Sequence, residues 1–279
     1  MTFLKKLGCA AAITLAAGAA QAENIMNHWD FNPTGGGKAN AQDINEYLDI
    51  NGAAFIQLTA TGGSSFSFAE HGAFNTVQAD GNGALFPVTF PGGNISITLD
   101  AYGTGTFGGN FKFTGGTVRM YQNTVNQYSS TTGMYGADQG TLIGTFDVLM
   151  GGGGKVDGKG NPTDNGQVSV FAEAKVGQLK AGYFFNDNGV DMSTLNNTAF
   201  AFTNANTIGS PTKNQVREIA CQFAKFTPAC SGTYANAPGQ YFFVANNGQF
   251  KFADVPEPGS VALFGIALFG LGAMRRRVK

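Results

Sequence analysis

The sequence predicts an all-β protein: mainly an antiparallel β-sandwich or jelly-roll-like fold, with one short disulfide-linked helix. Segments such as 95–99 and 167–174 alternate apolar and polar residues, a pattern typical of half-buried antiparallel strands. Gly, Asn and Asp clusters separate such segments by about ten residues, a spacing that favours a sandwich or barrel over alternating strands and helices. The chain also contains 25 phenylalanines, and aromatic residues suit a pleated core.

We expect a strand wherever this alternation persists between turn signals. In chain order the expected strands are 53–61, 65–69, 88–90, 95–99, 111–113, 117–121, 142–149, 167–174, 182–185 and 240–245. Turns are expected where residues that reach positive φ cluster, at 62–63, 80–83, 108–109, 115–116, 188–189 and 247–248. The segment 27–40 is expected to be irregular. The glycine run 151–154 is expected to be a loop or bulge, because no Lys-Ser/Thr follows it as a phosphate-binding loop requires.

One helix interrupts the strand pattern. Thr212 is its expected N-cap, and Gln215 follows at the spacing of a capping box. The next apolar residues recur on one helical face: Val216, Ile219, Ala220 and Phe223. A second helical turn is expected within 192–196.

The cysteines indicate a disulfide in the exported body. Cys221 falls within the predicted helix and Cys230 lies beyond Pro228, so a bond between them would join the helix end to the next loop. An exported chain favours that bond, which would contribute roughly 2–3 kcal/mol. We predict no metal centre, since neither His28 nor His71 has ligand spacing to the cysteines.

The N-terminus has the parts of a signal peptide. Lys5 and Lys6 precede the apolar stretch 7–19, and Ala20-Gln21-Ala22 forms a cleavage site for signal peptidase before Glu23. We therefore divide the chain into a signal peptide (1–22), a β-rich exported domain (23–254) and a C-terminal segment (255–279).

The C-terminal segment combines a proline motif, an apolar stretch and a basic end. Val255, Pro256, Glu257 and Pro258 precede the apolar stretch 261–274, and Arg275, Arg276 and Arg277 follow it. The prolines end any regular structure. The apolar stretch, about 21 Å long as a helix, is short against a hydrocarbon core of about 30 Å. The basic end favours a cytoplasmic C-terminus.

This segment resembles the PEP-CTERM sorting signal of Gram-negative bacteria. The resemblance implies recognition by exosortase, a membrane transpeptidase, and cleavage near the Pro-Glu-Pro motif. It also implies export, transient insertion of the segment in the inner membrane, and a final place at the cell surface or in the extracellular matrix. Carriers of the signal typically belong to bacteria that export polysaccharide.

Short phrases in the body are similar to a group of flocculation-associated PEP-CTERM proteins. They lie at 47–52, 66–68, 144–146, 165–170 and 181–185. This resemblance implies a part in floc formation by polysaccharide-producing bacteria, and it brings no catalytic residues with it.

The charge of the body argues against nucleic acid as a partner. Of the 17 basic and 18 acidic residues of the chain, the body keeps 11 and 17, a formal charge of −6. Nucleic-acid binding needs clustered Lys and Arg to displace counterions. A neutral or cation-bridged polymer remains compatible with this charge.

The sequence contains few residues that could act in catalysis. The chain has two histidines and no Gly-x-Ser-x-Gly motif. Glycoside hydrolysis needs two acids about 5–9 Å apart. Glu46, Glu70 and Glu173 are candidates, but the sequence gives no reason to choose a pair among them. We therefore expect no enzyme and no cofactor. The oxygen-rich segment 157–166 lacks the closing Glu and the Gly of an EF-hand, so an Asx-rich turn is favoured there over a calcium site.

Sugar binding would use exposed aromatic side chains, although each of them also suits a half-buried position in a sheet. The candidates are Trp29 and the tyrosines at 121, 128, 135, 183, 234 and 241. Tyr128, in the polar loop 127–132, and Tyr135 are the preferred glycan contacts.

Together these observations predict a cell-surface or matrix protein that associates with exopolysaccharide or with itself and promotes flocculation or biofilm aggregation. A carbohydrate-binding module is the alternative, and a polysaccharide-modifying enzyme is the third reading.

Overall fold

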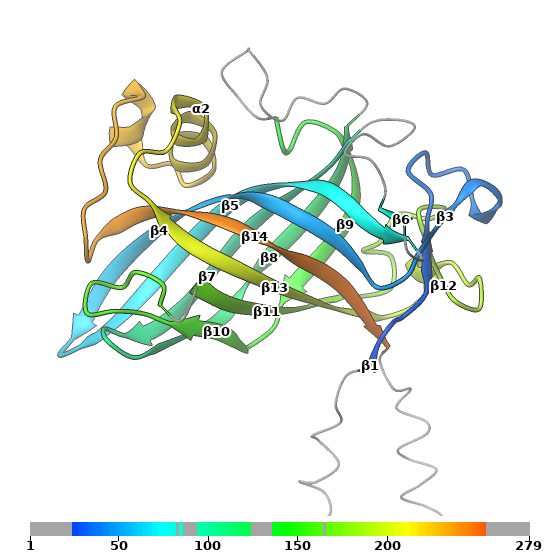
Figure 1. Cartoon of the computed structure of the whole chain (residues 1–279), viewed down its shortest axis with the longest axis horizontal. Coiled ribbons are helices and arrows are strands. Elements are labelled where there is room, and N and C mark those ends of the chain that lie inside the picture. Colours follow the sequence, from blue (N-terminus) through cyan, green and yellow to red (C-terminus); the bar gives the residue numbers. More distant parts are fainter. Residues whose placement is uncertain (1–23, 82–83, 86–93, 124–135, 164–165, 255–279) are drawn as a thin grey trace, which may run out of the picture. The chain divides into compact units, whose positions relative to one another are not determined.

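A computed structural model describes residues 24–81, 84–85, 94–123, 136–163 and 166–254, which are mainly antiparallel strands (Figure 1). The strands are β1 Asn24–Ile25, β2 Trp29–Phe31, β3 Gln42–Ile44, β4 Tyr47–Gly62, β5 Ser65–Gly81, β6 Ala84–Leu85, β7 Asn94–Thr106, β8 Asn110–Asn123, β9 Thr141–Val148, β10 Gly151–Lys155, β11 Gln167–Ala174, β12 Phe184–Asn186, β13 Asn197–Ile208 and β14 Tyr241–Asp254. The helical segments are η1 Lys38–Asn40, η3 Met192–Thr194, α2 Lys213–Gln215, η4 Val216–Phe223 and η5 Thr227–Ser231.

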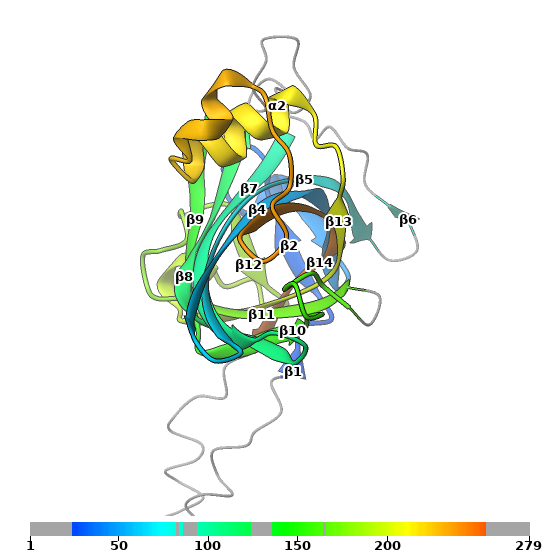
Figure 2. The same ribbon diagram turned by 90° about the vertical axis from the view of Figure 1, so that its left-hand side faces the viewer.

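The main sheet closes into a barrel, which is visible end-on in Figure 2. Among the described residues its order is β4-β5-β7-β8-β10-β11-β13-β14, and β14 pairs back to β4 from Tyr241↔Gln57 to Lys251↔Tyr47. Strand β9 also pairs with β8 and β11, at residues further along these strands than those that pair with β10. The antiparallel all-β prediction is confirmed. Within that class the structure is a barrel, because the first and last long strands pair with each other and leave no edge along this seam.

Alternation along each strand sorts the side chains between the two faces of the barrel wall. On β5, Phe66, Phe68 and Phe74 belong to the interior core, whereas Ala73 belongs to a second cluster beneath helix η4 on the outside. On β14, Phe242 faces the interior and Phe243 the helix. The period of two therefore supplies both cores from the same strands.

Phenylalanine rings in the barrel lie against glycines on the neighbouring strand. Phe66 pairs with Gly105 and Phe68 with Gly103 across β5 and β7, and Phe74 pairs with Gly52 across β4 and β5. A Cβ atom at any of these glycines would collide with the facing ring. The abundance of both residue types therefore has one cause: each ring fills the space that the facing glycine leaves open.

Aromatic side chains from a second sheet, β12-β2-β3, extend the interior core. Trp29 is fully buried and packs edge-on against Phe252 at a centroid distance of 5.0 Å, and Phe184 lies 5.7 Å from the same ring. The expectation that 27–40 is irregular is therefore wrong for Trp29–Phe31, which pairs on both sides as strand β2.

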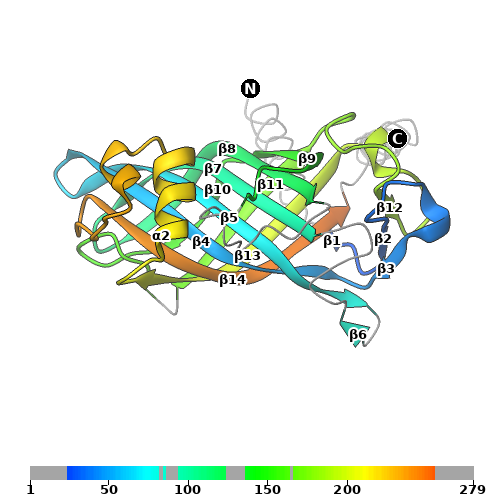
Figure 3. The same cartoon turned by 90° about the horizontal axis from the view of Figure 1, so that it is seen from above.

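The predicted helix is confirmed on the outside of the barrel (Figure 3). Thr212 and Gln215 form the capping box. Val216, Ile219 and Ala220 pack in the outer cluster that also contains residues of β4, β5 and β14. After its first turn the segment continues as a π-helix, and Ala224 N–H donates to the carbonyl of Ile219.

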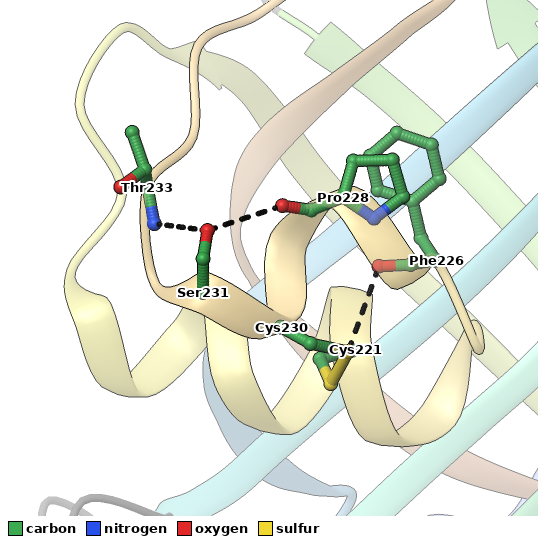
Figure 4. Close-up of a disulfide and its surroundings, with 6 residues drawn as sticks. All are labelled: Cys221, Phe226, Pro228, Cys230, Ser231 and Thr233. Carbon is green, nitrogen blue, oxygen red and sulfur yellow. Dashed lines mark hydrogen bonds between the residues drawn. A yellow bond between two sulfur atoms is a disulfide. The ribbon is translucent and has the colours of Figure 1, made fainter.

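The disulfide joins this helix to the 3₁₀ turn η5 (Figure 4). Cys221 and Cys230 have a Cα–Cα distance of 4.9 Å. Within the turn, Ser231 Oγ donates to the carbonyl of Pro228 and accepts from Thr233 N–H. The bond therefore ties the helix end to the following loop, as the sequence predicted.

Two predicted turns are instead parts of strands. Gly115-Gly116 lies inside β8 beside a break in register opposite Tyr102/Gly103. Asn247-Gly248 continues through β14 without interruption, paired to β4 and β13. Backbone pairing on both sides overrides the local turn preference of these residues.

Two strands also depart from the expected pattern. The glycine run 151–154 belongs to strand β10, which pairs with β8 across a break in register, so the expected bulge sits within a strand. Strand β13 was not predicted, because its interior residues are small or polar, namely Ala199, Ala201, Thr203 and Ala205. The 192–196 turn is confirmed as η3. The expected strand 88–90 lies outside the described residues.

No helix within the described residues is long and apolar enough to cross a membrane. The apolar stretch 261–274 lies outside those residues.

We predict that Gly103→Ala destabilises the barrel by about 1–3 kcal/mol, the typical cost of overpacking a core. The added methyl group would collide with the backbone oxygen of Lys112 and with the ring of Phe68. Gly209→Ala is the matched control, because a Cβ there has no neighbour within 4 Å. Urea unfolding should show a lower midpoint for Gly103→Ala only, and equal midpoints for the two variants would contradict the ring-against-glycine packing.

Candidate functional site

An open cleft of about 240 Å³ lies between the outer barrel wall and the end of helix η4. Strands β5, β7 and β8, residue 138 and the helix end all contribute to it. Its walls combine charged, amide and aromatic side chains: His71, Thr98, Leu99, Asp100, Arg119, Tyr121, Asp138, Gln222, Phe223 and Lys225. The cleft thus offers both hydrogen-bonding groups and aromatic faces.

A buried carboxylate fixes the segment that carries Asp138. Glu218 on helix η4 is fully buried, and its Oε1 accepts from Ala137 N–H at 2.8 Å. From β7, Ser96 Oγ donates to the carbonyl of Ala137 at 2.6 Å. The backbone beside Asp138 is therefore held by both the helix and the barrel wall, which positions that part of the cleft.

His71 and Tyr121 contribute side chains that are neutral near pH 7. Burial lowers the pKa of His71 and outweighs the opposing effect of Asp100, whose Oδ1 lies 3.4 Å from His71 Nδ1. Burial also raises the pKa of Tyr121, although Arg119 acts against that rise. Arg119 therefore lies beside a protonated phenol, which can donate as well as accept hydrogen bonds.

Lys225 stands at the end of the helix in a left-handed conformation, with φ of 54°. Among the residues that the structure describes, Lys225 is the one non-glycine residue with a positive φ. Phe226 N–H donates to the carbonyl of Ala220 at 2.8 Å across this reversal, as in a helix C-cap. Helix termination thus places Lys225 in the cleft.

A second, mainly apolar cavity of about 80 Å³ lies in the barrel interior. Its lining includes the carboxylic acid Glu70 and the amide Asn246, which are only 7% and 5% exposed. Burial raises the pKa of Glu70 to about 7. The side-chain oxygen of Asn246 is buried and has no hydrogen-bond partner. Together with Thr203, three polar side chains thus line an otherwise apolar cavity.

The preferred glycan contacts cannot be placed, because Tyr128 and Tyr135 lie outside the described residues. The same holds for the cleavage site at Ala20, Ala22 and Glu23 and for the sorting residues Val255, Pro256, Glu257, Pro258, Arg275, Arg276 and Arg277.

Two of the other aromatic candidates are buried. Trp29 is fully buried and Tyr183 is 5% exposed, so neither offers a face to sugar, because both pack into the interior core. Tyr121 does line the cleft. The sequence reasoning missed Tyr102, which is 55% exposed on β7 and lies over Gly115 on the next strand. Its place in an alternating strand, on the face opposite Ala101, is the signal that could have found it.

The structure does not bring the three glutamates together. Glu46 forms an ion pair with Lys251, and Glu173 lies 3.3 Å from Lys175, whereas Glu70 lines the interior cavity. They therefore provide no acid pair of the kind that glycoside hydrolysis uses.

The segment that begins at Asp157 forms the expected Asx turn. Its carboxylate accepts from the backbone N–H groups of Lys159 and Asn161 at 2.8 and 2.9 Å, and from the amide of Asn161. These bonds hold the carboxylate oxygens within the turn itself. Residues 164–165 of this segment lie outside the described residues.

Comparison with known proteins identifies the C-terminal segment. Residues 254–277 match the family model of the PEP-CTERM protein-sorting motif. No curated protein and no solved structure matches the chain significantly. The motif indicates export, processing by exosortase and sorting to the cell surface of a Gram-negative bacterium.

We predict that Glu70→Gln stabilises the protein above pH 7. Folding raises the Glu70 pKa from 4.5 to about 7, so the folded state binds this proton more tightly than the unfolded state does. The resulting stability is full below about pH 4.5 and is lost as the pH rises through 7, a change of about 3 kcal/mol. Glutamine mimics the protonated acid and avoids that loss.

Urea unfolding at pH 4 and pH 8 tests this expectation. The variant and the wild type should differ little at pH 4 and by about 3 kcal/mol at pH 8. Glu173→Gln, on the outer face of β11, is the control and should shift much less. An equal response of both variants to pH would show that Glu70 titrates as an exposed acid does.

Proposed function

We propose that this exported protein, which carries a PEP-CTERM sorting motif, joins the extracellular polysaccharide matrix and promotes flocculation or biofilm aggregation. The outer cleft is the observation that carries the proposal, because it combines aromatic side chains with carboxylates, an amide and an arginine. The role is one of binding and not of catalysis.

The chemistry of the cleft suits a sugar polymer. Sugar hydroxyls both donate and accept hydrogen bonds, and the cleft offers acceptors at Asp100 and Asp138 and donors at Arg119 and Gln222. Tyr121 and Phe223 add apolar surface for the C–H faces of a pyranose ring. Both signs of charge occur in the cleft, which favours a neutral or sparsely charged glycan over a polyanion.

The preferred glycan loop is close to this cleft along the chain. Tyr135 precedes Ala137 by two residues, and Ala137 is anchored beside the cleft by Glu218.

Polysaccharide is a better-supported partner than a second copy of the chain. Self-association by strand addition needs an unpaired sheet edge. The pairing of β4 with β14 closes the seam of the barrel, and the edges of the three-stranded sheet are the short strands β12 and β3. The barrel wall offers a rigid outer surface that holds the cleft, and the proposal therefore assigns matrix association to the cleft.

We predict that Arg119→Ala and Tyr121→Ala each weaken binding to purified exopolysaccharide roughly tenfold, because loss of a charge-assisted hydrogen bond costs about 1.5–3 kcal/mol and loss of an aromatic contact about 1 kcal/mol. Co-sedimentation with the polymer should show saturable binding of the wild type. Tyr102→Ala is the control, since it removes an exposed tyrosine outside the cleft. A larger loss of affinity for Tyr102→Ala than for the cleft variants would show that the polysaccharide binds outside the cleft.

We also predict that deleting residues 256–279 releases the protein into the medium, because the shortened chain lacks the motif that exosortase reads. Immunoblots of washed cells and of medium would measure the partition, and floc formation by a gene-deleted strain carrying the shortened chain should be reduced. Substituting Lys279 alone, outside the matched motif, is the control. Retention of the shortened chain on cells would count against sorting by this segment.

A further inference from the structure

We propose that the barrel interior binds one small, uncharged amphiphile, namely a hydrocarbon chain of about three carbons that carries a hydroxyl group. This inference concerns the interior cavity and goes beyond the matrix role of the outer cleft. It rests on the volume of the cavity, on its apolar walls and on an unsatisfied polar atom within it.

The cavity follows from unequal filling of a closed barrel. An interior of eight strands is wide enough either for side chains alone or for one small ligand. Rings from β5, such as Phe66 and Phe68, line one part of the cavity, whereas β13 contributes smaller side chains there, those of Ala199, Ala201, Thr203 and Ala205. The space that these alanines leave open has walls suited to a hydrocarbon.

Asn246 specifies a hydrogen-bond donor on the ligand. Its side-chain oxygen is buried and has no partner, and buried polar atoms in proteins are nearly always paired. The residues directly across from it are Gly52 on β4 and Ala205 on β13, neither of which has a side-chain donor. A hydroxyl group within the cavity would supply the missing bond.

Glu70 argues against a ligand with a carboxylate. It is the ionisable residue among those described as lining the cavity, and burial raises its pKa to about 7. Above that pH it is an anion that repels another anion in a medium of low dielectric constant. A hydroxyl group is compatible with both states, since it accepts from the protonated acid and donates to the ionised one.

The volume sets the length of the chain. The cavity of about 80 Å³ has about half the volume of an apolar cavity of about 150 Å³ that holds one benzene molecule, which has six carbons. A chain of about three carbons with a hydroxyl group matches this space, which is too small for a membrane lipid with two long acyl chains.

Calorimetric titration of the exported chain with 1-propanol tests the proposal. We expect saturable binding of one molecule per chain at pH 8, and at least tenfold weaker binding of propanoate. Affinity for 1-propanol should fall as the pH rises through 7 in the wild type but not in Glu70→Gln, because ionised Glu70 makes the cavity more costly to dehydrate.

Three substitutions locate the binding. Ala201→Leu fills the cavity and should weaken binding at least tenfold, whereas Ala245→Leu, on the exposed face of β14, should leave it unchanged. Asn246→Leu should remove the preference for 1-propanol over propane while keeping the core apolar. Circular dichroism would confirm that each variant is folded. If Ala201→Leu does not fold, the binding preference of Asn246→Leu tests the proposal.

Several outcomes would overturn the proposal. Equal binding by Ala201→Leu and the wild type would place the alcohol outside the barrel, for example on the apolar C-terminal stretch. Tighter binding of propanoate than of 1-propanol would contradict the part assigned to Glu70. The absence of saturable binding to the wild type would show that the cavity stays empty.

Discussion

Closure of the barrel is the constraint on which the rest of the structure depends. Because β14 pairs with β4 over most of its length, the interior has a fixed circumference that side chains must fill. Phenylalanines of β5 set against glycines of the neighbouring strands fill part of it. This packing makes each ring depend on the absence of a side chain opposite it. Where β13 offers alanines, the filling is incomplete, and the apolar cavity remains.

The same alternation that fills the interior also builds the outer site. Outward residues of β4, β5 and β14 form the platform on which helix η4 packs. The disulfide holds the end of that helix to the turn η5, and buried Glu218 links it to the backbone of Ala137. The outer cleft is thus bounded by parts that are fixed independently of each other, which suits a binding surface that needs to be preorganised.

The sorting motif and the proposed binding surface occupy different parts of the chain. The sorting motif at residues 254–277 begins where the last barrel strand ends, so its processing need not disturb the pairing of β14 with β4. The body carries few charges for its size and a formal charge of −6, which is compatible with association with a neutral polymer. The polar cleft lies on the outside of the barrel and the apolar cavity lies inside it. The two ligands proposed for them would therefore not compete for one site.

Much of this protein follows from local sequence. Period-two alternation determined most of the long strands, although not β13. Thr212 and Gln215 determined where the helix begins, and the cysteine pair determined the disulfide, because each signal acts over a few residues. The C-terminal motif could likewise be identified from the sequence, since its three parts are contiguous. Tertiary structure alone decided that the sheet closes, that Trp29 is buried, and that Asn247-Gly248 continues a strand. It also decided that Glu70 and Asn246 face one cavity, and that His71, Arg119 and Asp138 share a cleft. These outcomes depend on the pairing of strands far apart in the chain, and no short stretch of sequence encodes which strands will meet.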